Sequence, residues 1–259
     1  MAETNQNAAG KIDFDFPISG KIAVITGGGS GIGAAVATAF ASKGAQVVLL
    51  DLNAQAVESM AASLENAKSW VCDVTDAASV EKVISQIEAD FGRIDILVNS
   101  AGIVDLAPAE ELTQSAWQRT LDVNLTGSFN TCQAVGKRMI RQKSGKIVNL
   151  ASQAGTVAID GHVAYCASKF AIIGMSKTMA LEWGPHGITV NTISPTVVLT
   201  ELGRKAWEGP KGEALKKEIP TGRFAEPEEI AAAAVFLSSP ASDMINGADL
   251  LIDGGFTIK

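Results

Sequence analysis

The chain has 259 residues, 47% of them hydrophobic, and a formal net charge of −7. This acidic balance argues against a nucleic-acid-binding protein, which normally presents a basic face, so we expect no nucleic-acid partner. Every apolar run is shorter than the roughly 18 residues of a membrane-spanning helix, and the N-terminal stretch lacks the apolar core of a secretory signal. We therefore expect no membrane association and a cytoplasmic location.

The N-terminal segment 1–16 is polar and is predicted to be flexible. From residue 17 onward, short runs rich in Val, Ile and Leu predict strands buried on both faces of a parallel sheet. These runs are 21–26, 45–51, 68–73, 94–100, 145–152, 188–194 and 248–253. Helical patterns such as 80–91 and 227–239 separate them. The alternation predicts an α/β fold: one domain, 17–259, with a single Rossmann-type doubly wound seven-stranded parallel sheet and helices on both faces.

A glycine-rich turn, "TGGGSGIG" (26–33), directly follows the first predicted strand. Glycines permit a tight turn and let the backbone approach a pyrophosphate at a helix N-terminus. A glycine-rich loop is weak support by itself, but its position at the first strand-to-helix junction favours a dinucleotide. Gly33 would also let the helix pack close to the strand. The predicted cofactor contacts from this turn are Gly27, Ser30, Gly31, Ile32 and Gly33.

Two aspartates end the next two predicted strands. Asp51, followed by Leu52, can accept hydrogen bonds from both adenosine ribose hydroxyls and would repel a 2′-phosphate. No basic residue occurs at 28–30 or 52–53 to neutralise that phosphate, so NAD is favoured over NADP. Asp73, followed by Val74, is a candidate for the adenine amino group. The alternative is that each aspartate caps the following helix, which would begin near Asn53 or Asp76.

The cysteines and histidines give no sign of a metal site. Cys72, Cys132 and Cys166 are odd in number and widely spaced, without zinc-type spacing. They are interpreted as free thiols in a reducing compartment. His162 and His186 lack partners at ligand spacing, so no metal is expected.

From about Lys21 to the C-terminus, the sequence resembles the short-chain dehydrogenase/reductase family in its single-domain form. The resemblance rests on TGGGSGIG together with further short motifs in the right order. These are "NSAG" (99–102), where the family usually has NNAG, Asn124 in "DVN", Ser152 in "NLASQAG", Tyr165 and Lys169 in YxxxK, and "SPTVVLT" (194–200). If the YxxxK stretch is helical, Tyr165 and Lys169 share one face.

The resemblance implies four catalytic residues. Tyr165 would be the general acid–base, and the Lys169 ammonium with the oxidised nicotinamide ring would lower the pKa of its phenol from about 10. Both Tyr165 and Lys169 would also contact the cofactor, and Lys169 would hydrogen-bond the nicotinamide ribose. Ser152 would hold the substrate oxygen, and Asn124 would support a water that links Lys169 to solvent. The alternatives are an ordinary exposed Tyr165–Lys169 pair, a Ser152 loop cap and an Asn124 helix cap.

The resemblance also implies cofactor contacts from two other loops. The NSAG motif would contribute Asn99, Ala101 and Gly102, although Ser100 departs from the family pattern. In SPTVVLT, the Val198 backbone and the Thr200 hydroxyl would contact the carboxamide. Thr196 stands where the family usually has Gly, which leaves the geometry of that loop open.

The polar segment after Thr200 resembles the substrate-covering region of the subgroup that contains L-xylulose reductase and sugar-alcohol dehydrogenases. In that comparison, His162 and Trp207 would line a polyol pocket, beside Ser152 and Tyr165. Gln153 could add a hydroxyl contact, and such side chains suit a small polyhydroxylated substrate. The alternatives are that His162 is solvated and that Trp207 packs against its own helix.

The expected function is NAD-dependent, reversible oxidation of a sugar alcohol of four to six carbons to a ketose. One alternative is a β-ketoacyl or other carbonyl reductase, for which the basic run Lys137, Arg138, Arg141 and Lys143 offers a docking surface, although Asp51 argues against it. Another is a non-catalytic dinucleotide-sensing protein on the same fold.

The resemblance further implies a homotetramer, or a homodimer, built through the predicted helices 124–142 and 163–183. Apolar residues on these helices include Phe129, Val135, Ile172 and Met175. The sequence does not distinguish interface from core at these positions.

Overall fold

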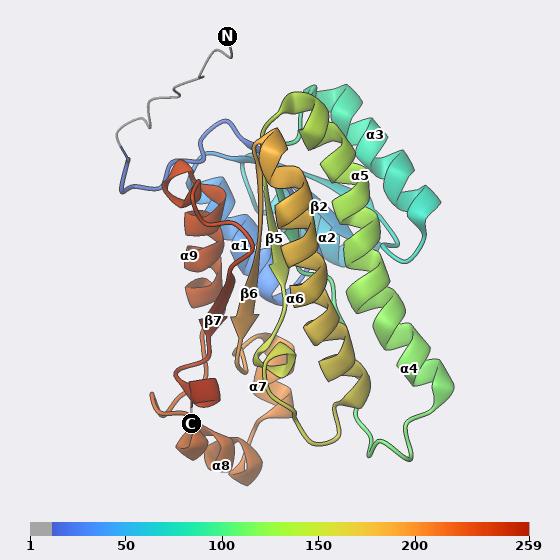
Figure 1. The fold of residues 1–259 in the computed structure, drawn as a ribbon, viewed down its shortest axis with the longest axis vertical. Coiled ribbons are helices and arrows are strands. Elements are labelled where there is room, and N and C mark those ends of the chain that lie inside the picture. Colours follow the sequence, from blue (N-terminus) through green and yellow to red (C-terminus); the bar gives the residue numbers. More distant parts are fainter. Residues whose placement is uncertain (1–11, 259) are drawn as a thin grey trace.

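A computed structural model of the chain describes residues 12–258 (Figure 1). Residues 1–11 of the predicted flexible segment lie outside the described residues. At the end of that segment, Phe16 packs edge-on against Phe236 of helix α9 (Pro227–Ser238), with ring centroids 5.3 Å apart. The packed structure therefore already includes Phe16.

The described residues form one seven-stranded sheet with the order β3-β2-β1-β4-β5-β6-β7, and every pairing is parallel. The strands are β1 (Ile22–Thr26), β2 (Gln46–Asp51), β3 (Ala67–Val71), β4 (Ile96–Asn99), β5 (Gly145–Leu150), β6 (Ile188–Pro195) and β7 (Asp249–Ile252). The predicted fold class is confirmed. Strand β1 pairs with both β2 and β4, so the strand order reverses there, and a crevice forms at such a switch point.

Strand β3 differs from the prediction of strands buried on both faces. Its residues Lys68 and Val71 are exposed, whereas all residues of β1, β4 and β6 are buried. The reason is position, because β3 is an edge strand with a single neighbour, β2.

Helices cover both faces of the sheet (Figure 1). One apolar core joins the sheet to α1 (Gly31–Ser42), α2 (Ala54–Ala62) and α9, with Phe40 and Val57 among its buried residues. The other joins it to α3 (Ala77–Phe91), α5 (Gly127–Gln142) and α6 (Val163–Trp183), with Ile84 and Met139 buried. The fold thus presents its strand ends, rather than a face, to a ligand.

Shorter elements surround the carboxyl ends of the strands. Helix α4 (Gln114–Leu121) runs into α5 through a π-helical turn, Asp122–Thr126. Helices α7 (Glu201–Ala206) and α8 (Pro210–Glu218) follow β6 and lie beyond the ends of β6 and β7 in Figure 1. Among residues 12–258, no helix is long and apolar enough to span a bilayer.

Candidate active site

The glycine-rich turn requires its glycines for two physical reasons. Gly27 and Gly31 have φ values of +64° and +55°, the left-handed region that favours glycine. A Cβ on Gly33 would lie 2.2 Å from the carbonyl oxygen of Gly27, and a Cβ on Gly27 would lie 2.9 Å from Ala101 Cα. The loop after β4 therefore comes so close to Gly27, and the start of α1 so close to the turn, that neither position leaves room for a side chain.

The N-terminus of α1 is prepared for an anion. Its N-cap residue, Ser30, makes no side-chain capping hydrogen bond, and its first turn contains no acidic residue. The first N–H groups of a helix have no partner within the helix and carry a partial positive charge. A phosphate group placed there would satisfy them.

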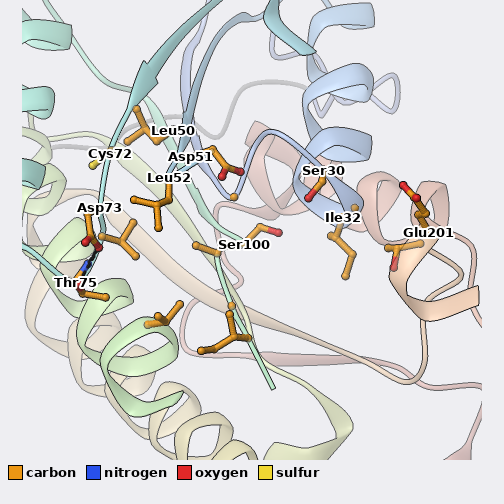
Figure 2. A pocket seen from close by; sticks show the side chains of 18 of the residues that line it. Ser30, Ile32, Leu50, Asp51, Leu52, Cys72, Asp73, Thr75, Ser100 and Glu201 are labelled. Carbon is orange, nitrogen blue, oxygen red and sulfur yellow. Dashed lines mark hydrogen bonds between the residues drawn. The ribbon is translucent and has the colours of Figure 1, made fainter. Parts of the chain in front are cut away.

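A cavity of about 650 Å³ opens beside this turn (Figure 2), within the usual size of ligand pockets. Most of the predicted cofactor contacts line it: Gly27, Ser30, Gly31, Ile32, Asp51, Leu52, Asp73, Val74, Ala101, Gly102 and Thr200. They come from the carboxyl ends of β1, β2, β3 and β4 and from the start of α7, so the fold brings together residues far apart in the sequence.

Five predicted cofactor residues do not line the cavity: Gly33, Asn99, Val198 and the catalytic residues Tyr165 and Lys169, which are described below. The Asn99 amide lies in the core, where it donates to Asn149 Oδ1 at 2.8 Å and accepts from Thr131 Oγ1 at 2.7 Å. Val198 is buried beneath the loop after β6. In this structure Asn99 and Val198 belong to the packed interior rather than to the cavity surface.

Other residues that line the cavity were not predicted: Leu50, Cys72, Thr75, Ser100, Ile103, Val123, Glu201 and Lys205. Leu50, Cys72 and Ser100 adjoin the ends of predicted strands, so the strand-end rule itself would have found them. The Thr26 hydroxyl accepts hydrogen bonds from the N–H groups of Ser100 and Ala101, each at 3.2 Å. Although Ser100 differs from the residue usual in the family motif, the backbone at this position is still hydrogen-bonded to β1.

The two strand-end aspartates are not helix caps. Asp51 accepts hydrogen bonds from the N–H groups of Gly29 and Asn53, each at 3.0 Å, while Asn53 itself caps α2. Asp73 accepts from the Thr75 N–H and hydroxyl at 2.9 and 2.7 Å.

The helix-cap interpretation is therefore wrong for both aspartates. Asp76 is the residue that caps α3. Each strand-end carboxylate stays on the cavity wall, and Asp51 also ties β2 to the glycine-rich turn.

Tyr165 and Lys169 occupy successive turns near the start of α6, and Lys169 is buried. Its Nζ lies 5.4 Å from the centroid of the Tyr165 ring and donates to the Leu150 carbonyl at 2.7 Å. The alternative of an exposed surface pair is therefore wrong.

Ser152 follows β5, and its Oγ accepts a hydrogen bond from the Ala154 N–H at 3.1 Å, so the interpretation of Ser152 as the cap of a short turn is confirmed.

Burial dominates the electrostatics of this pair. It lowers the pKa of Lys169 from 10.5 to about 8 because the charged form loses hydration. It also raises the pKa of Tyr165, against which hydrogen bonding to the Ser152 hydroxyl acts. The lowered Tyr165 pKa that the sequence predicts is therefore not found in the protein without its cofactor, where the pKa is raised.

The lowered pKa of Lys169 predicts a pH-dependent stability. At pH values between about 8 and 10.5, the folded protein binds fewer protons at Lys169 than the unfolded chain does. The free energy of unfolding of the cofactor-free protein should therefore rise from pH 8 toward 9.5, relative to a Lys169→Met variant. Urea unfolding of both proteins across this range measures the difference. Parallel pH curves would contradict the prediction, since both proteins retain Tyr165.

Asn124 lies inside the π-helical turn between α4 and α5, so the interpretation of Asn124 as a helix cap is wrong. The side chain is fully buried and exchanges hydrogen bonds with the Ile103 backbone, at 2.8 and 2.9 Å, and donates to Ser168 Oγ at 3.1 Å. A Cβ on Gly102 would lie 3.3 Å from Asn124 Oδ1 and 3.9 Å from Lys169 Nζ. Because Gly102 lines the cavity, the catalytic residues adjoin the predicted cofactor site.

Two of the predicted substrate residues lie beside Ser152 and Tyr165. Gln153 is 4% exposed, and its Oε1 is a buried atom with no hydrogen-bond partner. The His162 ring meets the Tyr165 ring edge-on at 6.2 Å, and its Nδ1 lies 2.6 Å from the Asp160 carbonyl oxygen.

Trp207 does not pack against its own helix, so that alternative is wrong. Its ring lies 6.1 Å from the Phe224 ring and 4.7 Å from Lys211 Nζ, both outside its own helix. Neither contact joins Trp207 to Ser152 or Tyr165, so its substrate role stays a prediction.

Metal-ligating side chains do not gather in the described part of the chain. Within residues 12–258, no three His, Cys, Asp or Glu side chains are arranged to hold an ion.

The parallel sheet, the cavity at its switch point and the Ser–Tyr–Lys cluster define a nicotinamide-dependent oxidoreductase. Residues 27–257 match the family described as "Enoyl-(Acyl carrier protein) reductase". A D-threitol dehydrogenase of Mycolicibacterium smegmatis is 63% identical over 96% of this chain and 97% of that protein. The chain belongs to the short-chain dehydrogenase/reductase family.

Two further proteins bear on cofactor and substrate. An NAD-dependent glycerol dehydrogenase of Listeria innocua is 51% identical over 95% of this chain and 98% of that protein. The crystal structure of a gluconate 5-dehydrogenase from Burkholderia cenocepacia in complex with NADP and tartrate has a TM-score of 0.90 and 37% identity, over 94% of this chain and 98% of that one. Both relatives are named for polyhydroxylated substrates. The name of the Listeria protein specifies NAD, whereas the Burkholderia structure is a complex with NADP.

Proposed function

We propose that the protein oxidises a small polyol of four to six carbons to a ketose with NAD, reversibly. The observation that carries the proposal is the buried, unpaired Gln153 Oε1 next to Ser152. An acceptor without a partner is costly to bury, and a substrate hydroxyl beside the reacting carbon would satisfy it. The similarity to dehydrogenases named for D-threitol and glycerol supports the same substrate class.

Asp51 supports NAD as the cofactor. Its carboxylate lines the cavity at the end of β2 and is held by the N–H groups of Gly29 and Asn53. In that position it would accept from both adenosine ribose hydroxyls, and it would repel the 2′-phosphate of NADP. The glycine turn and the α1 N-terminus fit the pyrophosphate.

The chain's own residues provide the acid–base chemistry. Ser152 donates a hydrogen bond to the substrate oxygen while Tyr165, as phenolate, accepts the hydroxyl proton. Lys169 holds its ammonium near the phenol, and Asn124 fixes the backbone beside Gly102. When bound, an oxidised nicotinamide would serve as the hydride acceptor and would supply a positive charge that favours the phenolate. His162 and Trp207 complete the proposed substrate contacts.

Initial rates with a panel of C4 to C6 polyols, each with NAD and with NADP, test this function. We expect turnover of at least one polyol with NAD and much less with NADP, with simple secondary alcohols as controls. Activity confined to hydrophobic alcohols would overturn the substrate class. Preference for NADP would overturn the role of Asp51 while leaving the family unchanged.

The structure reduces the charge of the docking surface that the carbonyl-reductase alternative needs. Of the predicted basic run, Arg138 is buried and pairs with Glu81 and Glu88, at 2.6 and 3.0 Å. Arg141 pairs with Glu88 at 2.8 Å. Two of the four positive charges are thus paired with carboxylates of α3, which weakens the case for an acidic carrier protein.

We also propose assembly into a homotetramer, or a homodimer, through α5 and α6. Of the apolar residues predicted for this face, Val135 and Ile172 are buried in the core, whereas Phe129 and Met175 line a groove between the two helices. Phe170 and Leu181 of α6 are exposed apolar residues that a second copy would cover. Light scattering of the purified protein gives the oligomer mass directly.

A cytoplasmic location remains part of the proposal. All three cysteines are free, and Cys72 and Cys132 are buried. Free thiols of this kind are typical of proteins kept in a reducing compartment.

A further inference from the structure

Lys205 of α7 lines the dinucleotide cavity together with Thr200 and Glu201. The start of α7 lies against the start of α1, because a Cβ on Gly31 would be 3.4 Å from Thr200 Cγ2. Figure 2 shows Glu201 on the same side of the cavity as Ser30 and Ile32, across from Asp73 and Thr75. Lys205 therefore belongs to the part of the wall that faces the α1 N-terminus.

Lys205 carries the only positive charge among the described side chains that line this cavity, where Asp51, Asp73 and Glu201 are acidic. Its side chain is exposed and takes part in none of the ion pairs of the described residues. The neighbouring Arg204, in contrast, pairs with Glu226 at 2.9 Å. Within the described residues, no carboxylate forms an ion pair with Lys205, so an ion pair does not account for its position on the cavity wall.

We propose that Lys205 binds the pyrophosphate of the dinucleotide, opposite the N–H groups of the α1 N-terminus. The helix terminus supplies backbone donors from one side, and the ammonium supplies a full charge from the other. Such a contact would also hold α7, which begins at Glu201, over the bound cofactor. The inference rests on the proposed cofactor site, and it is independent of which polyol is oxidised.

A Lys205→Ala variant tests the contact by binding rather than by activity. The dissociation constant of NADH, measured by fluorescence titration in low salt, should rise about 5- to 10-fold, as expected for one partly exposed charge-assisted hydrogen bond. In about 1 M salt, where charges are screened beyond roughly 3 Å, the difference from wild type should shrink toward zero. A Lys205→Arg variant should restore most of the affinity.

Competition against NADH locates the lost contact on the ligand. ADP-ribose, which carries the pyrophosphate, should bind more weakly to Lys205→Ala than to wild type, whereas adenosine should bind equally to both. The matched control is Lys217→Ala, which removes an exposed lysine of α8 outside the cavity. It should bind all three ligands as wild type does.

Each other outcome overturns the inference. Unchanged NADH and ADP-ribose affinities in Lys205→Ala would show that Lys205 does not contact the pyrophosphate. An equal loss for adenosine would assign the effect to a disturbed cavity instead. Wild-type protein that bound no dinucleotide would overturn the proposed function as well, which separates that failure from the other two.

Discussion

A Tyr165→Phe protein should lose about 10³-fold or more in kcat for polyol oxidation while it binds NADH as wild type does. Tyr165 is the group that takes the hydroxyl proton, and a positioned acid–base contributes roughly 10²- to 10⁴-fold. The substitution removes one oxygen and keeps the ring, which packs against His162 at 6.2 Å and under Lys169 Nζ at 5.4 Å. Initial rates and a fluorescence titration with NADH measure the two quantities separately.

The same pair of measurements distinguishes an enzyme from a dinucleotide sensor. A sensor would bind NADH in both proteins and turn over no polyol in either, so the variant would change nothing. Substantial turnover by Tyr165→Phe would instead require another base, which contradicts the assignment. A Cys166→Ala variant, next to Tyr165 on α6, provides a control that should retain activity.

The fold could be predicted from the sequence because its strongest signals are local. Runs of Val, Ile and Leu place all seven strands to within a few residues, and the glycine turn marks the first strand-to-helix junction. The exposure of β3 could not be predicted in this way. It depends on the order of strands in the sheet, which leaves Lys68 and Val71 at an edge.

The cavity wall shows the same division between local and long-range information. Residues at strand ends, such as Asp51 and Asp73, follow from position in the chain, although their hydrogen-bond partners do not. Glu201 and Lys205 reach the cavity only because α7 folds back onto the start of α1. Similarly, the sequence shows two apolar residues on the predicted helices, Val135 and Met175. Only the folded structure shows that Val135 is buried in the core and that Met175 lines a groove.

The catalytic cluster illustrates why chemistry needs the folded environment. The YxxxK spacing places Tyr165 and Lys169 on one helix face, but the depth of that face determines their pKa values. Burial moves the pKa of Lys169 to about 8 and that of Tyr165 upward. Likewise, the π-helical turn that holds Asn124 in the core has no signature in the letters DVNLT.

A Gln153→Met protein should lose the preference for polyols over simple secondary alcohols. In the wild type, Gln153 Oε1 is buried without a partner, so a substrate that lacks the neighbouring hydroxyl leaves it unsatisfied. Sites that hydrogen-bond a substrate hydroxyl reject the analogue lacking it strongly, and for this single contact we expect about 100-fold or more in kcat/KM. Rates with a polyol and with a matched mono-alcohol, for both proteins, measure this ratio.

The methionine variant also carries a readout independent of activity. Methionine has nearly the same length and volume as glutamine, and it removes the unpaired oxygen instead of leaving a cavity. The free energy of unfolding should therefore rise by roughly 1 kcal/mol, while kcat/KM for the polyol falls and that for the mono-alcohol stays level or rises. A Gln153→Asn control keeps the amide but withdraws it from the substrate. If the ratio of the two rate constants is the same in wild type and Gln153→Met, then Oε1 does not recognise the substrate, and the polyol proposal loses its structural basis.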